Sequence, residues 1–395
     1  MPQGALEAIQ TTHQTLQELG PFSWDAGVFS VKETEKTRQA IAQELQVSPK
    51  TITLTQNVLS GCNIPLWGMD WQAGDHILLS DCEYPAVIAT VQELQHRFGI
   101  EYSFCPLMDT LNGGDPLVVI GEHLRPMTRL VIVSHVLWNT GQVLPMKEMI
   151  EVCHRYGESL ASNPTNNHPT SALESDRPKI RVLVDAAQSV GVLPLNVAEL
   201  NADFYAFTGH KWWCGPAGLG ALYIHPDAYD SIRPTFIGWR GVIKDKQGNP
   251  VGFHDDGQRF EVSTYDVTSM IALREAIAIH DQWGTAEERY QRLTELSAYL
   301  LQQLQAIPQL HCFRNAPPES GLIFFQLKRV DSTGGDSIKV EDPHMAFVRE
   351  LERQGFLLRT ILTPDCMRAC VNYLTLESEI DALVDAIKAL LPKFV

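Results

Sequence analysis

Short apolar stretches rich in β-branched residues recur through the first half of the chain, and segments with helical periodicity separate most of them. Ala86–Phe98 and Met146–Tyr156 are two such helical segments. This alternation is typical of a largely parallel sheet covered by helices. The sequence therefore predicts a doubly wound α/β domain with strands at Thr51–Thr55, His76–Ser80, Glu101–Cys105, Arg129–Ser134, Ile180–Val184, Asp203–Thr208 and Leu219–His225.

The pattern changes near Met270, where amphipathic helices replace the strand-helix alternation. Two helices, a strand and a closing helix are expected there, at Ile271–Trp283, Ala286–Ile307, Gly321–Leu327 and Glu377–Leu391. We predict a large domain over 20–268 and a smaller α+β domain over 269–395, joined by the helical segment 1–19 that Gly20-Pro21 separates from the rest. The segments 158–179 and 331–343 have the composition of surface loops.

Charge and composition narrow the classes of protein. The 47 acidic and 31 basic residues give a net charge of −16, which disfavours binding to nucleic acid or to an anionic membrane. No apolar run approaches the roughly 18 residues of a membrane span, and the N-terminus lacks a leader pattern, so we expect a soluble, cytoplasmic protein. The eight cysteines include no CxxC pair and are expected to be buried or idle thiols, with no metal site.

Ligands of open α/β sheets bind beyond the carboxyl ends of the strands, so polar residues that follow strands are of interest. Asp185 directly follows the stretch Ile180–Val184, and Gln188 lies three residues on. A carboxylate there could pair with a protonated pyridine nitrogen, and the amide could reach a phenolic oxygen on the same ring. The alternative is a loop aspartate that caps a helix.

Lys211 stands in the run Thr208-Gly-His-Lys211-Trp-Trp, again after a predicted strand. Aromatic and small neighbours would remove water from its ammonium group, which lowers the pKa of a lysine and lets it act as a nucleophile and a base. An ordinary exposed lysine is the alternative.

Two further strand ends carry weaker signals. In Thr55-Gln-Asn57-Val-Leu-Ser-Gly a strand runs into a helix, whose N-terminal N–H groups could hold a phosphate. In Cys82-Glu-Tyr84-Pro an aromatic face could lie over a heterocycle. Taken alone, the first stretch is more often a purely structural feature, and a plain core tyrosine is the more frequent outcome for the second.

Taken together, these motifs resemble the class V aminotransferase-like enzymes of fold type I, which use pyridoxal 5′-phosphate (PLP) and include the cysteine desulfurases. The resemblance runs from about Trp24 to Leu390, and within the group it is greatest to the L-cysteine/cystine C–S lyases. It implies the PLP-dependent transferase fold, a mainly parallel seven-stranded sheet with a smaller α+β domain, and a homodimer whose subunits share the active sites.

The resemblance also implies roles for individual residues. Lys211 matches the lysine that holds PLP as a Schiff base, Asp185 the partner of the pyridine nitrogen, and Gln188 the partner of the phenolic oxygen. Further matches are Tyr84 for the residue stacked on the ring, Thr208 and His210 for phosphate contacts, and Thr264 for a phosphate contact from the other subunit. Where the family commonly has a threonine pair in the phosphate loop, this chain has Val58-Leu59, so the backbone amides and Asn57 must do more of the holding.

A substrate carboxylate is best held by the planar fork of an arginine. Arg359 and Arg368 match the family's substrate-side arginines, with Arg368 the stronger candidate. Asn139 matches a polar residue near the cofactor oxygen and the substrate, although Trp138 is an alternative for that position.

The expected reaction is a β-elimination on L-cystine, or on cysteine, with release of pyruvate, ammonia and a persulfide or sulfide. A persulfide is a better leaving group than a thiol, which favours cystine. The alternatives are a cysteine desulfurase with a sulfur acceptor as a further partner, then a racemase or epimerase, and finally a catalytically silent binding or scaffold protein. Cys366, between the two arginines, is expected to be structural because its segment is short and contains Pro364.

Overall fold

A computed structural model describes residues 1–161, 179–328 and 342–394 of the chain. Most of the two predicted loops, 158–179 and 331–343, therefore lies outside the described residues. Their described ends are partly helical, because α6 runs on to Ala161 and α10 begins at Pro343.

The chain divides into two compact units. The first comprises Met1–Leu107, Asp115–His135 and Leu144–Gly284, and the second comprises Met108–Gly114, Val136–Val143 and Thr285–Val395. This grouping differs from the predicted division, which placed 1–19 and 269–284 with the small domain and 108–114 and 136–143 with the large one. The physical reason is that α1 (Gln3–Leu19) packs along α8 (Val267–Trp283) and both belong to the first unit.

A seven-stranded, mainly parallel sheet forms the centre of the first unit, as predicted. Its strands stand in the order β1-β7-β6-β5-β4-β2-β3, and β7 alone runs antiparallel to its two neighbours. Each predicted strand lies within one residue of an observed one. The strands are β1 (Ile52–Thr55), β2 (His76–Ser80), β3 (Glu101–Cys105), β4 (Thr128–Ser134), β5 (Arg181–Asp185), β6 (Phe204–Thr208) and β7 (Gly220–Ile224).

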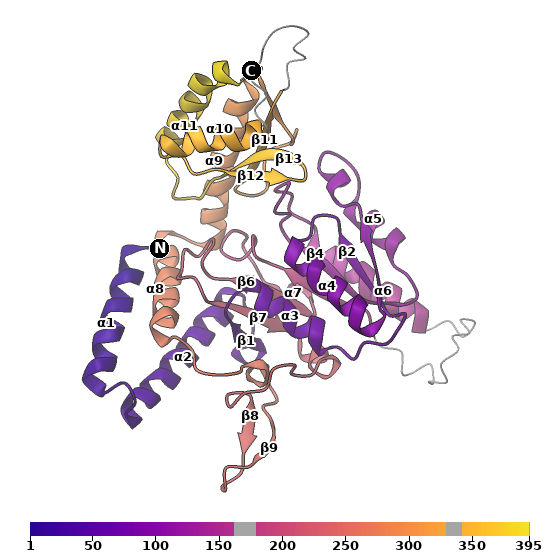
Figure 1. The fold of residues 1–395 in the computed structure, drawn as a ribbon, viewed down its shortest axis with the longest axis vertical. Helices are drawn as coiled ribbons and strands as arrows, with labels where there is room; N and C mark the ends of the chain where they lie inside the picture. The colour runs from indigo at the N-terminus through magenta and orange to yellow at the C-terminus, as the bar shows by residue number, and fades with distance from the viewer. Residues whose placement is uncertain (162–178, 329–341, 395) are drawn as a thin grey trace. The chain divides into compact units, whose positions relative to one another are not determined.

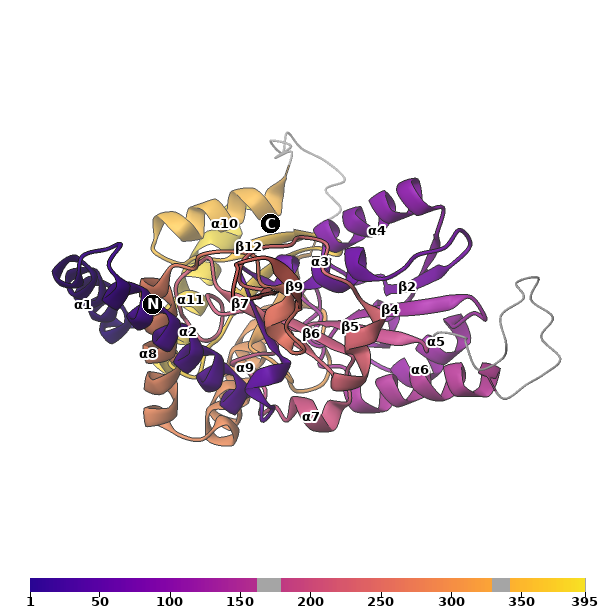
Figure 2. The ribbon, with the colours of Figure 1, turned by 90° about the horizontal axis from the view of Figure 1, so that it is seen from below.

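Helices cover both faces of this sheet (Figure 2). One face carries α3 (Val58–Gly68) and α4 (Pro85–Phe98), and the other carries α5 (Pro116–His123), α6 (Met146–Ala161) and α7 (Val197–Leu200). The central strands are therefore buried on both sides, which explains why they appear in the sequence as continuous apolar runs. Under α3 and α4 the core includes Leu66, Ile77, Val91, Leu183 and Phe204.

In the first unit, the N-terminal residues form a layer of helices, and a later segment forms one hairpin. α2 (Trp24–Glu44) was not predicted, because its buried face includes Glu33, Thr34 and Arg38 and so lacks an apolar pattern. The hairpin of β8 (Val242–Lys244) and β9 (Pro250–Phe253) projects away from the seven-stranded sheet (Figure 1). In the described part of the chain, no helix is both long and apolar enough to cross a bilayer.

The second unit is an α+β structure built on a four-stranded antiparallel sheet with the order β10-β11-β13-β12. Its core joins the sheet to three helices through residues such as Leu304, Phe325, Phe347, Met367 and Ile387. The elements are α9 (Ala286–Gln305), β10 (Leu310–Cys312), β11 (Leu322–Leu327), α10 (Pro343–Arg353), β12 (Arg359–Leu362), β13 (Asp365–Cys370) and α11 (Glu377–Leu390).

Candidate active site

Strand pairing brings several of the predicted site residues to the carboxyl edge of the seven-stranded sheet. Ser134 at the end of β4 pairs with Asp185 at the end of β5. Gly220, the first residue of β7, pairs with Thr55 at the end of β1 and with Thr208 at the end of β6. The segments that follow β1, β5 and β6 therefore leave the sheet side by side.

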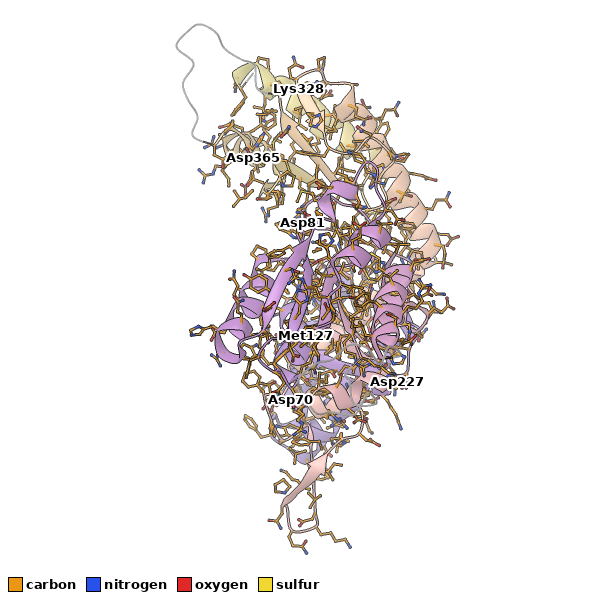
Figure 3. The ribbon with its side chains drawn as sticks, turned by 90° about the vertical axis from the view of Figure 1, so that its right-hand side faces the viewer. Asp70, Asp81, Met127, Asp227, Lys328 and Asp365 are labelled. Carbon is orange, nitrogen blue, oxygen red and sulfur yellow. The ribbon has the colours of Figure 1, made fainter. Side chains whose placement is uncertain are left out.

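The side-chain view locates this edge (Figure 3). Asp81, which directly follows β2, lies at one end of the first unit, and Asp70, Met127 and Asp227 lie toward the other end. Apart from Thr264, the residues predicted to bind a cofactor lie at or directly after the ends of β1, β2, β5 and β6, so they belong to the end that Asp81 marks.

Asp185 holds a buried carboxylate at the end of β5. Only 5% of the residue is exposed, and its Oδ1 accepts a hydrogen bond from the Ala187 N–H at 2.9 Å. Burial raises the pKa of this carboxyl above its usual value, while the Ala187 N–H and the positive charge of Lys211 oppose that rise. A buried carboxylate of this kind is stabilised when a cation is placed against it.

Lys211 stands on a loop that backbone hydrogen bonds fix on both sides of it. The Gly209 N–H donates to the Leu219 carbonyl, and the Gly215 N–H donates back to the Gly209 carbonyl. A Cβ on either glycine would lie within 3 Å of a terminal methyl of Leu273 in α8, so that side chain would have to shift. Lys211 itself is exposed, so the expected loss of solvation is not seen; its aromatic neighbours turn into the core instead.

Thr208 and His210 lie at the start of the same loop. The Thr208 hydroxyl and His210 Nδ1 are 2.7 Å apart and share a hydrogen bond. Partial burial and the charge of Lys211 lower the pKa of His210, which favours the neutral imidazole. With this hydrogen bond kept and the imidazole neutral, the pair has one proton left to donate to an anion, either from the hydroxyl or from Nε2, depending on the tautomer.

Gln188 and Trp212 are joined across the two loops that follow β5 and β6. The Trp212 indole N–H donates to Gln188 Oε1 at 2.9 Å. The sequence placed these residues in separate motifs, and no local signal indicates that they meet.

Asn57 begins α3 directly beyond β1. Its Oδ1 accepts from the Ser60 N–H at 3.0 Å and so caps the helix. The Gly61 N–H donates to the Asn57 carbonyl and makes the first hydrogen bond within the helix. The N–H groups of Val58 and Leu59 therefore lie at the open start of the helix. Such groups bind phosphate.

Tyr84 and Glu83 follow β2 at the start of α4. Tyr84 is 46% exposed, which leaves its ring accessible. Glu83 is buried and was missed by the sequence reasoning. Its carboxylate accepts from the Ser80 hydroxyl at 2.5 Å and from the Ser134 N–H and hydroxyl at 2.8 and 2.9 Å. The only signal for Glu83 in the sequence was that an acidic residue stands beside Tyr84.

Thr264 belongs to the same unit but to a separate, exposed segment before α8. The segment is fixed at both sides of Thr264. Glu261 is buried against Arg38 at 2.6 Å and Arg240 at 3.1 Å, and the Tyr265 hydroxyl donates to the Leu54 carbonyl at 2.8 Å. Thr264 is therefore held outward on a rigid support.

Arg359 and Arg368 belong to the second unit, where β12 and β13 place them directly opposite each other. Arg368 Nη1 donates to the Trp138 carbonyl at 3.1 Å, and its buried Nε has no hydrogen-bond partner among the described residues. Arg359 is exposed. Like charges that face each other across a strand pair are destabilising, unless an anion lies with them.

Asn139 is 2% exposed in the second unit. Its Nδ2 donates to the Thr363 carbonyl in the β12–β13 turn at 3.3 Å, while its Oδ1 is buried and finds no partner in the described chain. The amide therefore has one anchored end and one end that can accept a hydrogen bond.

The residues at the carboxyl edge match the chemical groups of PLP one by one. A buried carboxylate suits a pyridinium nitrogen, an amide suits a phenolic oxygen, and a primary amine can link an aldehyde. An open helix start with a nearby hydroxyl and imidazole suits a phosphate. These residues therefore fit PLP as the cofactor.

Comparison with known proteins agrees with this fit. The family model described as "Aminotransferase class-V" matches residues 3–162 and 168–382. The chain is 26% identical over 373 residues to isopenicillin N epimerase from Streptomyces clavuligerus, covering 90% of this chain and 84% of the epimerase. It is also 26% identical over 356 residues to a cysteine desulfurase from Haloferax volcanii, covering 86% of this chain and 74% of the desulfurase.

Two solved structures are more similar, and both are of the protein C-DES. One is the complex of the cystine C–S lyase C-DES with its reaction product cysteine persulfide; it is 45% identical, with a TM-score of 0.88, over 98% of this chain and 94% of that one. The other, a lysine-to-alanine mutant with glycine covalently linked to the PLP cofactor, has the same identity and TM-score over 98% and 93%. With the family model matched over nearly its whole length, this chain belongs to the class V aminotransferase family.

Proposed function

We propose that this chain is a PLP-dependent carbon–sulfur lyase that cleaves L-cystine by β-elimination. Cystine and one water molecule give pyruvate, ammonia and cysteine persulfide. The Cβ–S bond breaks, its electron pair leaves with the persulfide, and water supplies the oxygen of pyruvate. The same reaction on cysteine would release sulfide, which is a poorer leaving group.

The observation that carries the proposal is the position of Cys366. A desulfurase needs a thiol that moves to the substrate sulfur and accepts it. Cys366 instead lies in β13, paired with Ile361 of β12 and fully buried. Burial raises the pKa of its thiol to about 12, so the nucleophilic thiolate is scarce at neutral pH. A persulfide released directly is therefore favoured over transfer to this cysteine.

The facing arginines support cystine as the substrate. Arg359 and Arg368 occupy opposite positions in one hairpin, so two guanidinium groups are available from one small element. Cystine carries two carboxylates, whereas cysteine carries one. We propose that Arg368 binds the carboxylate of the half that reacts, and that Arg359 serves the second carboxylate.

The roles of the remaining residues follow from their chemistry. PLP, when bound, accepts the electron pair that remains on Cα after proton loss. Lys211 holds the cofactor and, once the substrate amine has released it, takes the Cα proton. Asp185 keeps a proton on the pyridine nitrogen, and Gln188 donates to the phenolic oxygen. Asn57, Thr208, His210 and the start of α3 bind the phosphate.

Similarity to C-DES supports this choice among the activities of the family, since that protein is described as a cystine C–S lyase. Relatives at 26% identity include desulfurases and epimerases, so sulfur transfer and epimerisation are the competing reactions. Each gives a different product from the same substrate.

We further propose that the protein acts as a homodimer. Large apolar side chains are exposed on the first unit, among them Phe236, Ile237 and Trp239, and Val251 and Phe253 of the β8–β9 hairpin. Exposed apolar groups of this size favour a protein interface. Together with the rigidly held, exposed Thr264, they support active sites that two copies complete.

The test is a product assay on the purified protein with L-cystine or L-cysteine. Pyruvate, alanine, sulfane sulfur and the D-enantiomer of the substrate are measured separately. We expect pyruvate and sulfane sulfur in equal amounts from cystine, and slower sulfide release from cysteine. The Lys211→Ala variant should fall below about 1% of wild-type turnover. Alanine as the main product would replace the lyase by a desulfurase, and racemised substrate would replace it by an epimerase.

A further inference from the structure

Trp212 makes one contact that the proposed reaction does not explain by itself. Its indole N–H donates to Gln188 Oε1 at 2.9 Å, and both residues belong to loops at the carboxyl edge of the sheet. The indole N–H can only donate, so it can bind only the oxygen end of a glutamine amide. We propose that Trp212 is a positioning residue that fixes the Gln188 amide with its NH₂ end free to donate to the phenolic oxygen of PLP.

Trp212 is itself held in place, as a positioning residue must be. It is 7% exposed, and its backbone packs against Gly191, whose φ of +85° and close approach exclude a side chain there. The next residue, Trp213, is fixed by a hydrogen bond from His280 Nε2 of α8 to its carbonyl at 2.8 Å. The backbone around Trp212 is therefore fixed, and its buried indole has little room to follow a glutamine that rotates.

The Gln188 side of the contact is equally restrained. The Ala186 N–H donates to the Ala206 carbonyl of β6 at 2.8 Å, and the Ser189 N–H closes a turn onto the Ala186 carbonyl at 3.2 Å. Only the side-chain torsions of Gln188 then remain variable. Since the two ends of an amide have the same shape, packing alone cannot select one of them, and a donor-only partner can.

The orientation matters because the phenolic oxygen of PLP is an acceptor. An NH₂ group facing it stabilises its negative charge, whereas an amide oxygen facing it would oppose that charge. Stabilising the phenolate lowers the pKa of the proton that the phenolic oxygen shares with the linked Lys211 nitrogen. Trp212 should therefore influence the cofactor without touching it. The inference rests on the proposed role of Gln188 toward PLP, but not on which substrate the enzyme takes.

The experiment is a pH titration of the visible absorption of the holoenzyme without substrate. Trp212→Phe removes the indole N–H and keeps an aromatic ring. We expect the titration midpoint to rise by roughly half a unit to one unit, the size expected for one neutral hydrogen bond. Trp213→Phe is the matched control, since that buried ring packs edge-on against Phe207 and should leave the midpoint unchanged.

A double-mutant cycle separates amide orientation from a general disturbance of the loop. In a Gln188→Ala background the Trp212→Phe change should no longer move the midpoint, because there is no amide left to orient. An equal shift in both backgrounds, or no shift in the single variant, would overturn the inference.

A further variant covers the case in which Trp212→Phe does not fold. Gln188→Glu still accepts from the indole but offers no donor to the phenolic oxygen, so it should raise the midpoint at least as much as Trp212→Phe. An unchanged midpoint in Gln188→Glu would also overturn the inference. A wild-type protein that gains no visible absorption with PLP would instead refute the proposed cofactor, and the inference with it, whereas an unexpected product from cystine would leave the titration result standing.

Discussion

Glu83 carries a buried carboxyl group that the fold keeps protonated over an unusually wide pH range. Burial, together with the nearby charge of Asp185, raises the pKa of Glu83 to about 8, although the hydrogen bonds from Ser80 and Ser134 act in the opposite direction. The folded pKa thus lies above the ordinary value near 4.5. Between these values the folded chain binds this proton more tightly than the unfolded chain, so Glu83 makes stability fall as the pH rises through that window.

Glu83→Gln should remove this loss of stability with rising pH. We expect the variant to gain stability relative to wild type as the pH is raised from about 5 to about 8, because glutamine keeps the shape of a protonated acid and cannot ionise. Urea unfolding of the cofactor-free proteins at several pH values measures the difference. Glu148→Gln, at an exposed position on α6, is the control. Parallel stability curves for wild type and Glu83→Gln would contradict the assignment.

At the scale of elements, the pairing of β12 with β13 favours a lyase over a desulfurase, because it holds Cys366 in the sheet. Its four cross-strand pairs run from Arg359–Arg368 to Leu362–Asp365, so Cys366 cannot leave without breaking the ladder. We expect Cys366→Ser to keep most pyruvate formation from cystine and to lose about 1–3 kcal/mol of stability, because a hydroxyl replaces a buried thiol. Cys370→Ser, at an exposed position on the same strand, is the control. Loss of turnover together with a shift from pyruvate to alanine would favour a sulfur-carrying Cys366.

The same element shows where sequence reasoning stops. The central strands of the large sheet were predictable because burial on both faces makes them continuous apolar runs, whereas the edge strand β3 is largely exposed. β12 and β13 were not, because arginine, threonine and aspartate occupy them and only the fold shows that they pair. Lys211 and Asp185 could be predicted to lie at one edge of the sheet because the carboxyl ends of parallel strands meet there. The Trp212–Gln188 and Glu83–Ser134 contacts could not, since each joins residues distant in the chain.

At the scale of the whole molecule, the proposed dimer implies that Thr264 serves the partner's cofactor. The segment around it is fixed to its own subunit through Glu261 and Tyr265, while Thr264 itself is exposed. A rigid segment with an outward hydroxyl is suited to a contact on another copy. If so, Lys211 and Thr264 of one chain belong to different active sites, and their defects should be separable in mixed dimers.

We expect Lys211→Ala and Thr264→Asp each to be nearly inactive alone, the second because a carboxylate would repel the cofactor phosphate. When the two are unfolded, mixed in equal amounts and refolded, half of the dimers should be mixed, and each mixed dimer contains one site with neither change. Activity should then return to about a quarter of the wild-type value. Mixing Lys211→Ala with the double variant Lys211→Ala/Thr264→Asp is the matched control and should restore nothing, because every site then lacks its lysine. If mixed dimers form, as native mass spectrometry can verify, but activity stays at the level of the parents, Thr264 acts within its own subunit or not at all. Recovery would instead place the lysine and the threonine of each site on different chains. Catalysis would then require the dimer.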